Sequence, residues 1–505
     1  MKRFPILCLL PFLVLLPGLV PAAEAPSHDA AFREGWSLLE KERYAEARGA
    51  FAGIPAKEFD LGDYVIYFEG MAAARERKRA EASEAAGRLA ALYPQSPLIP
   101  YLQHEIAFAA AVDNDAAAAR QAFAASRGKV AGSGRKSEEG YIAAVLAEEG
   151  GATPAAAALH LENFASYTPQ EGAILSYERL WLWRKDGKLA EWDLPVGFFA
   201  KLARAVNRAG DPERARALYE ESLRKFPPSD DYYAMVLDYA EFHRKEGETA
   251  EAMALLRTQL ADAPPQFQSE VRFLRARVEW KAGRLAEARK EFLEIAAGSA
   301  RSGTADRARY LAAWIAEDEG DVAGATEQFG RLRRAADDAT RQEALFRYPY
   351  GLYRQERYEE AAAAFAAGEK GGFGSVENAR HRFWRARALR AAGKGEEADL
   401  LVGDLSGDAF AGIYAMFAVK ERGGDPFRIL SSPSSGETEA CGEERERLWA
   451  KVRGAPWEPA DAEKVRRAER LVLLGMVEYA VLEADRVDRV AARKALGLAD
   501  GGAPG

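Results

Sequence analysis

The chain has 505 residues, of which 29% are charged, 10% are aromatic and 48% are hydrophobic. This composition excludes a disordered chain, because such chains have too few apolar and aromatic residues to build a core. The net charge of −8 argues against a nucleic-acid partner, and no basic patch with interleaved aromatic residues occurs.

The first residues predict a signal for export. Lys2 and Arg3 are positively charged, residues 4–20 are apolar, and small residues follow. We therefore expect a signal peptide over residues 1–22, cleaved after Ala22, and a mature protein in the periplasm. A membrane anchor is disfavoured because prolines interrupt the apolar run and because the run is short for a bilayer.

The cysteine and histidine residues predict no metal and no cofactor. Cys8 lies too early in the apolar run for lipid attachment, and after cleavage Cys441 alone remains, which excludes an intramolecular disulfide and a thiolate metal site. The five histidines are His28, His104, His160, His243 and His381. No two of them have the sequence spacing of metal ligands. No glycine-rich loop follows a strand pattern, so a phosphate-binding site is not predicted either.

One helix–turn–helix pattern recurs along most of the chain. Gly283 suits the left-handed end of a helix because it has no Cβ, and Ala288 and Phe292 share one face of the helix that follows. The steps between successive turns are 35 to 37 residues, with one exception of 23. The matching turn positions are Glu42, Arg77, Asn114, Gly151, Gly187, Gly210, Gly247, Gly320, Glu356 and Gly393.

The small and large residues after each turn recur as well. The residue five positions after each turn is alanine in every repeat except one, where it is Trp192. The residue nine positions after the turn is generally large and apolar, but it is Ala86 in one repeat and His160 in another. A single helix pair cannot bury its apolar face alone, so the pairs must stack. We predict an all-α fold, a right-handed α-superhelix (solenoid) of tetratricopeptide-like helix pairs. Aromatic residues near the ends of the first helices, with Trp280, Trp314 and Trp384 among them, are expected to pack between helices; the alternative is that they stack on a ligand.

The short step near Pro195 divides the repeats into two blocks. Proline cannot continue a helix, so one helix is cut short and a new one is predicted over residues 196–208. The expected organisation after the signal peptide is a series of four segments. They are an N-terminal helical-repeat block at 23–194, a second block at 195–403, a linker-like helical segment at 404–490 and a disordered tail at 491–505.

Three motifs near the C-terminus occur in a specific order. An Arg/Ala-rich helix is predicted at 378–389, Ala-Gly-Ile-Tyr-Ala stands at 411–415, and Arg-Ala-Glu-Arg-Leu-Val-Leu-Leu-Gly stands at 467–475. In this order they resemble the superhelical (U-shaped) and linker regions of the soluble lytic murein transglycosylases. That family has a Tyr-Tyr-Gly-Leu-Leu-Ala type helix at the second position, so the doubled tyrosine is missing here.

The resemblance implies a role in peptidoglycan but no catalysis by this chain. The family cleaves glycan strands with one glutamate as acid and base, in a lysozyme-like domain that carries a Glu-Ser-x-Phe motif. The nearest string here, Glu221-Ser222-Leu223-Arg224, lacks the aromatic residue and falls within a regular second helix. Either a catalytic domain was lost or the reading frame is truncated, and if it is truncated the parent would be a lytic transglycosylase.

The predicted function is therefore that of an exported, non-catalytic scaffold in murein remodelling, with peptidoglycan glycan strands as its partner. The alternative is a periplasmic tetratricopeptide-repeat scaffold for protein–protein interaction in envelope assembly, because repeat solenoids commonly bind peptides in their grooves. The sequence identifies no catalytic, metal or cofactor residues, and the residues that bind the partner are not defined by it.

Overall fold

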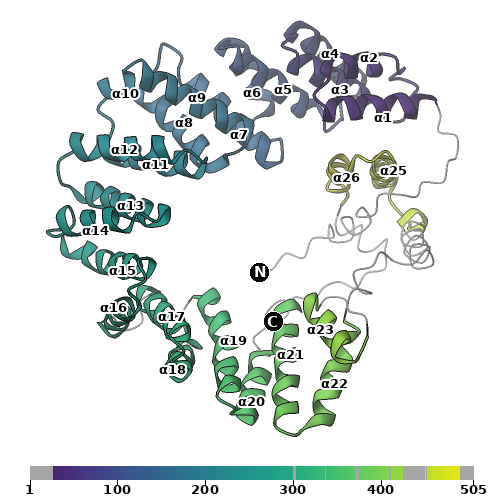
Figure 1. Ribbon diagram of the computed structural model, residues 1–505. Coiled ribbons are helices and arrows are strands. Elements are labelled where there is room, and N and C mark those ends of the chain that lie inside the picture. The colour runs from purple at the N-terminus through teal and green to yellow at the C-terminus, as the bar shows by residue number, and fades with distance from the viewer. Residues whose placement is uncertain are drawn as a thin grey trace. The chain divides into compact units, whose positions relative to one another are not determined.

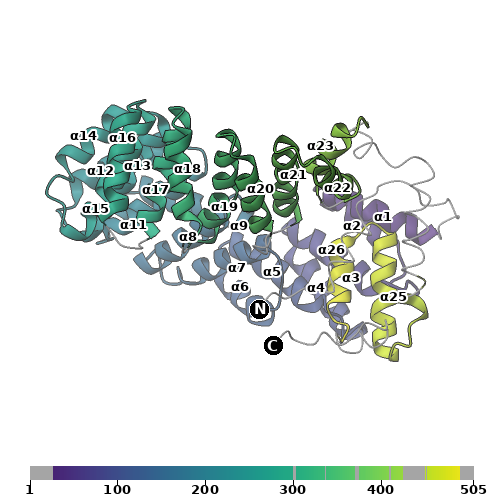
Figure 2. The same ribbon diagram turned by 90° about the horizontal axis from the view of Figure 1, so that it is seen from below.

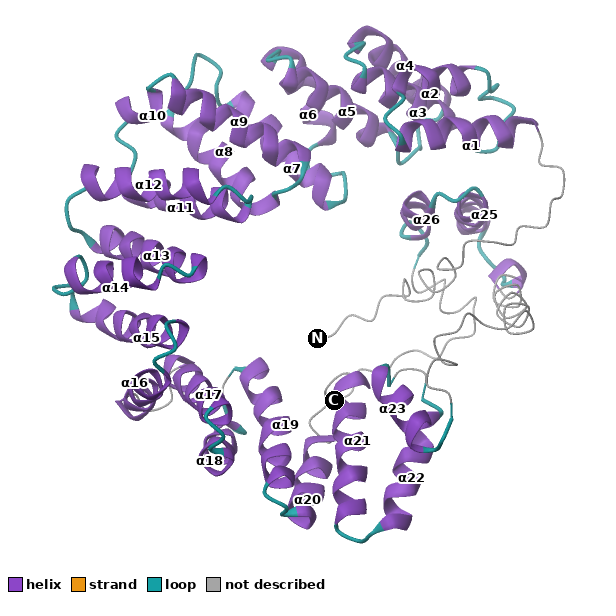
Figure 3. Ribbon diagram, viewed as in Figure 1, coloured by secondary structure: helices purple, strands orange, loops and turns teal. Residues whose placement is uncertain are grey.

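The computed structural model describes residues 27–298, 303–335, 337–369, 375–408, 411–424, 450 and 452–488. Within these ranges all regular secondary structure is helical (Figure 3), which confirms the all-α class. In the described part of the chain, no helix has the length and apolarity needed to span a membrane. The predicted signal peptide, Cys8, Cys441 and the predicted tail lie outside the described residues.

The chain forms two compact units, which are described separately. Unit 1 comprises residues 1–194 and 433–505, and unit 2 comprises residues 195–432. The helices of unit 1 are α1 (Ser27–Glu40), α2 (Tyr44–Ala52), α3 (Gly62–Arg75), α4 (Arg79–Leu92), α5 (Ile99–Val112), α6 (Ala116–Ser126), α7 (Ser133–Leu146), α8 (Pro154–Tyr167), α9 (Glu171–Lys185), α10 (Lys188–Glu191), α25 (Pro459–Leu473) and α26 (Val477–Ala484).

Unit 2 is a stack of helix pairs, in which first helices line one side and second helices the other (Figure 1). Its helices are α11 (Val196–Arg208), α12 (Pro212–Lys225), α13 (Asp230–Glu246), α14 (Thr249–Thr258), α15 (Pro265–Lys281), α16 (Leu285–Gly298), α17 (Gly303–Asp318), α18 (Val322–Leu332), α19 (Asp338–Arg354), α20 (Tyr358–Glu369), α21 (Ser375–Ala391), α22 (Gly395–Ser406) and α23 (Ile413–Glu421).

Every predicted turn position has a left-handed backbone. Gly283 has φ +79°, and the remaining glycine turns are also positive. The four turns without glycine have the same conformation, with φ between +57° and +63°. These are Glu42, Arg77, Asn114 and Glu356. The helix–turn–helix repeat predicted from the sequence is therefore confirmed, including the positions where a side chain must tolerate the left-handed region.

The residues that mark each second helix form the core between the pairs. Ala288 and Phe292 are fully buried, and the Phe292 ring lies 5.5 Å from that of Phe273 on the preceding first helix. The small alanine allows the helices to approach closely, and the phenylalanine fills the space beyond it. Near Pro195 the pattern breaks as predicted, because α10 has only four residues and α11 begins at Val196.

Arginines connect each of four helix pairs to the next pair. An arginine six residues after the turn forms an ion pair with an acidic residue beside the following turn. The pairs are Arg48–Glu76 (3.1 Å), Arg120–Glu149, Arg216–Glu248 (2.6 Å) and Arg289–Glu319 (2.8 Å). Because these side chains are partly exposed, each pair stabilises the stack by about 1 kcal/mol at most.

The C-terminal helix pair packs against the first helices of unit 1. Figure 2 shows α25 and α26 beside α1 and α3. Tyr479 of α26 is 5% exposed, and its ring lies 5.2 Å from Phe68 and 5.6 Å from Trp36. Leu471 and Met476 are fully buried in the same apolar core. The first and the last helices that the structure describes therefore share one hydrophobic core in unit 1.

Candidate functional site

The first helices of unit 2 present a face whose charges are largely paired. We call the exposed side of α11, α13, α15, α17, α19, α21 and α23 the first-helix face. Ion pairs join neighbouring first helices along it. They are Arg204–Asp238, Arg277–Glu241 (3.2 Å), Arg347–Glu317 (3.0 Å), Arg380–Glu343 (3.5 Å) and Arg390–Glu421 (2.7 Å). Positive charge is therefore matched by carboxylates, which makes the face a poor site for a polyanion such as a nucleic acid.

Aromatic residues on this face are only partly buried. The guanidinium of Arg347 lies over the ring of Trp314 on α17, 4.1 Å from the ring centroid. The guanidinium of Arg387 lies over the ring of Trp384 on α21, 5.2 Å from its centroid. Other partly exposed rings are Trp280, Tyr310, Tyr350 and Tyr353. Trp280, Trp314 and Trp384 are predicted from the sequence to pack between helices. They do so on one side, while the other side leaves an apolar surface edged by arginines.

A pocket of about 310 Å³ lies between α11 and α13. It is lined by Arg204, Asn207, Arg208, Tyr219, Asp238, Glu241, Phe242 and Lys245. Burial raises the pKa of the Tyr219 hydroxyl to about 12, against the opposing effect of the Arg204 charge. The hydroxyl therefore remains protonated near neutral pH and can donate a hydrogen bond. Sequence reasoning missed this pocket because Tyr219 occupies the ordinary position of a large core residue.

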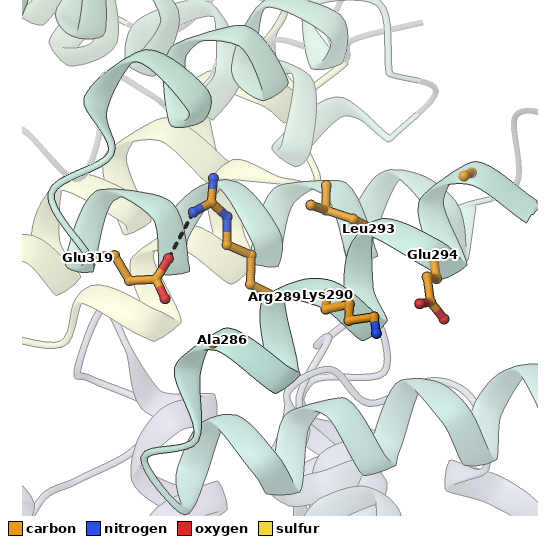
Figure 4. Close-up of a pocket in the computed structure, with 7 residues that line it drawn as sticks. Ala286, Arg289, Lys290, Leu293, Glu294 and Glu319 are labelled. Carbon is orange, nitrogen blue, oxygen red and sulfur yellow. Dashed lines mark hydrogen bonds and ion pairs between the residues drawn. The ribbon is translucent and has the colours of Figure 1, made fainter.

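A second, more open groove follows α16 on the second-helix side of the stack. It has a volume of about 520 Å³ and is lined by Ala286, Arg289, Lys290, Leu293, Glu294, Ala297 and Glu319. Figure 4 shows the ion pair between Arg289 and Glu319 at one end of this groove. Arg289 therefore serves to connect this helix pair to the next one. Its charge is explained by the stacking of the repeats and does not indicate a ligand.

Unit 1 contains a serine, a histidine and a glutamate in the order of a catalytic triad. His160 Nδ1 lies 3.2 Å from Ser176 Oγ, and His160 Nε2 lies 2.9 Å from Glu148 Oε1. However, Ser176 and His160 are both fully buried, and Ser176 also accepts a hydrogen bond from Asn163. A nucleophile must reach its substrate, so this arrangement is a hydrogen-bonded polar core. Burial lowers the pKa of His160 despite the charge of Glu148, which favours the neutral ring.

The string that most nearly matches a transglycosylase motif lies in α12. Ser222 is 1% exposed, and its hydroxyl donates to the carbonyl oxygen of Leu218 at 2.7 Å. Glu221 directly precedes Ser222 on the same regular helix, as predicted from the sequence. In the part of the chain that the structure describes, no three His, Cys, Asp or Glu side chains gather in a way that could hold a metal ion.

Comparisons with known proteins concern the repeats. A family model described as tetratricopeptide repeat matches residues 207–278. A comparison with curated protein sequences found no match. The similar solved structures include the 70 kDa soluble lytic transglycosylase from Escherichia coli, with 15% identity, a TM-score of 0.43 and coverage of 92% of this chain and 72% of that chain.

Two further solved structures are similar. An inactive variant of the lytic transglycosylase Slt from Pseudomonas aeruginosa has 14% identity, a TM-score of 0.38 and coverage of 94% of this chain and 68% of that chain. The tetratricopeptide domain of P58(IPK) has 12% identity, a TM-score of 0.21 and coverage of 76% of this chain and all of that chain. Two lytic transglycosylases are thus among the solved structures to which this chain is similar, and residues 207–278 match the tetratricopeptide-repeat model.

Proposed function

We propose that this chain is an exported, non-catalytic α-superhelical scaffold that binds murein glycan strands on the first-helix face of unit 2. The observation that carries the proposal is the series of partly exposed aromatic rings on α15, α17, α19 and α21. A sugar ring has an apolar C–H face that packs on an aromatic ring, as other apolar groups do. The neighbouring guanidinium groups of Arg347 and Arg387 can donate hydrogen bonds to sugar hydroxyls and to carboxylates.

The predicted compartment supports the proposal. Residues 1–22 have the features of a cleaved signal peptide, and export to the periplasm brings the mature chain to the murein layer. The motif order at 378–389, 411–415 and 467–475 supports the same assignment, because it resembles the non-catalytic regions of murein-cleaving enzymes.

Sedimentation with isolated murein sacculi tests the proposal. The purified mature chain is expected to pellet with sacculi and to remain in solution without them. A chain that stays wholly in the supernatant in both cases would contradict glycan binding. Release of anhydro-muropeptides by this chain alone would contradict the non-catalytic part of the proposal.

A peptide-binding scaffold in envelope assembly is the second candidate. The match of residues 207–278 to the tetratricopeptide model favours it, because such repeats are commonly used to bind protein segments. Cross-linking in the periplasm separates the two candidates. Recovery of one protein partner and no glycan would favour the peptide scaffold, whereas recovery of murein fragments would favour the glycan scaffold.

A further inference from the structure

The pocket between α11 and α13 contains a buried phenol whose polar end is not used by the protein. Tyr219 is 2% exposed, and its hydroxyl has no hydrogen-bond partner among the residues that the structure describes. The Tyr219 oxygen is not among the fully buried unpaired polar atoms of the described residues, so it opens into the pocket, where it can donate a hydrogen bond to a ligand. Its ring is held firmly, since it stacks on Tyr239 with 4.8 Å between ring centroids.

The carboxylates of the pocket are already engaged by arginines. Asp238 pairs with Arg204, and both oxygens of Glu241 accept hydrogen bonds from Arg244, at 2.7 and 2.8 Å. Arg277 adds a further bond to Glu241 at 3.2 Å. These two acidic side chains therefore have little remaining capacity to bind a positively charged ligand.

The remaining polar groups of the pocket are mostly donors. The ammonium of Lys245 lies 4.0 Å from the nearest oxygen of Glu241, and its side chain is 60% exposed. Together with the hydroxyl of Tyr219 and the amide of Asn207, it can donate to an oxyanion. A dianion such as phosphate is less suitable, because Asp238 and Glu241 lie in the same pocket and would repel it.

The size of the pocket indicates a small ligand. An apolar cavity of about 150 Å³ holds one benzene molecule, so a pocket of twice that volume holds about a dozen non-hydrogen atoms. Its volume of about 310 Å³ is also at the lower end of the range for small-molecule sites. Phe242, which is 3% exposed, lines the pocket beside these donors and can contact an apolar portion of the ligand.

We propose that this pocket binds the carboxylate of a small organic ligand of about dipeptide size, with Tyr219, Asn207 and Lys245 as its donors. The inference goes beyond glycan binding and does not rest on it, because the aromatic rings that carry that proposal lie on α15, α17, α19 and α21, outside the pocket. The ligand's carboxylate accepts hydrogen bonds, and its apolar part contacts Phe242.

Isothermal titration with the dipeptide alanyl-alanine tests this site in the mature full-length chain. Saturable binding is expected, and the carboxamide form of the same dipeptide should bind about tenfold more weakly, because it lacks the charge. Tyr219→Phe keeps the ring and removes only the hydroxyl, and Lys245→Ala removes the cation. Each substitution is expected to weaken binding by about tenfold. Thermal unfolding of each variant shows that the fold is retained.

Lys281→Ala is the matched control. Lys281 stands two residues before Gly283, as Lys245 stands two residues before Gly247, and it is exposed but does not line the pocket. Binding by this variant should equal that of the unaltered chain. The proposal is overturned if alanyl-alanine does not bind saturably, if the carboxamide binds equally well, or if Tyr219→Phe and Lys245→Ala bind as the control does. Inorganic phosphate that binds more tightly than the dipeptide would also overturn it.

Discussion

Arg467 of α25 donates hydrogen bonds to both carboxylate oxygens of Asp63 on α3, at 2.8 and 2.9 Å, although 404 residues separate them. Arg467 also donates to Glu483 of α26 at 2.9 Å. The side chains of Asp63 and Glu483 are 4% and 0% exposed, so this network is buried where the C-terminal pair meets the N-terminal helices. Unit 1 therefore depends on contacts between α3 and the helix pair α25–α26.

Arg467→Ala is expected to destabilise unit 1 strongly. The substitution leaves two buried carboxylates without their common partner, which costs about 3–5 kcal/mol. Urea unfolding followed by circular dichroism measures this loss, and limited proteolysis should release the C-terminal helix pair earlier than in the unaltered chain. Burial lowers the pKa of Arg467, but the charges of Asp63 and Glu483 raise it by more, so the pKa lies above its usual value and the guanidinium stays charged.

Arg466→Ala provides the control for this prediction. Arg466 is the adjacent residue, its side chain is 70% exposed, and it pairs with Glu463 on the same helix. Its loss is expected to change stability by about 0.5 kcal/mol or less. If the two variants were equally stable, the buried contact between the chain ends would be refuted.

The stability of unit 1 should fall in acid because of Glu105. Burial raises the pKa of this glutamate, but the charges of Arg75 and Arg135, at 2.8 and 2.6 Å, override burial and lower the pKa to about 2. Its folded-state pKa lies below the usual 4.5, so its contribution is complete above that value and is lost as the pH falls towards about 2.

Glu105→Gln should remove this part of the acid sensitivity. The variant is expected to be less stable than the unaltered chain near neutral pH, and the difference should shrink as the pH falls below about 4.5. Urea midpoints measured across this range show the trend. Glu84→Gln changes an exposed residue on α4 and is the control. The difference in stability between this variant and the unaltered chain should be near zero at every pH. A constant difference for Glu105→Gln down to about pH 2 would contradict the assignment.

Two turns of unit 2 should respond in opposite ways to substitution. Glu356 has φ +61°, a conformation that costs a residue with Cβ about 1–2 kcal/mol, whereas Gly283 adopts φ +79° at no such cost. Glu356→Gly should therefore raise the unfolding free energy by about 0.5–1 kcal/mol after the entropy of glycine is subtracted, and Gly283→Ala should lower it by about 1 kcal/mol. Thermal unfolding measures both, and a destabilised Glu356→Gly would argue against strain at this turn.

The sequence predicts the repeats well because their signals are local. The turn at Gly283 and the buried face formed by Ala288 and Phe292 follow from residues only a few positions apart. The predicted helix at 196–208 agrees with α11, since Pro195 stands directly before it. Even Arg77 and Glu356 are identified as turns, because the constant period replaces the missing glycine signal.

The long-range contacts were beyond sequence reasoning. Nothing near Arg467 indicates that its partner is Asp63, because the contact depends on how the C-terminal pair packs on α3. The pocket was missed for a similar reason, since Tyr219 has the spacing of a core residue and its unused hydroxyl appears only when α11 and α13 are placed beside it. The partial exposure of Trp314 likewise depends on how the neighbouring first helices are spaced.

Sedimentation of Trp314→Ala and Trp384→Ala with murein sacculi tests the central claim most directly, namely that the first-helix face of unit 2 binds glycan. Each substitution removes a ring that can stack on a sugar, so the affinity for sacculi should fall about fivefold, which corresponds to about 1 kcal/mol. Leu400→Ala removes an apolar side chain that is 72% exposed on the second helix α22, and it should bind as the unaltered chain does. Equal binding by all three variants, with their folds intact, would contradict the account.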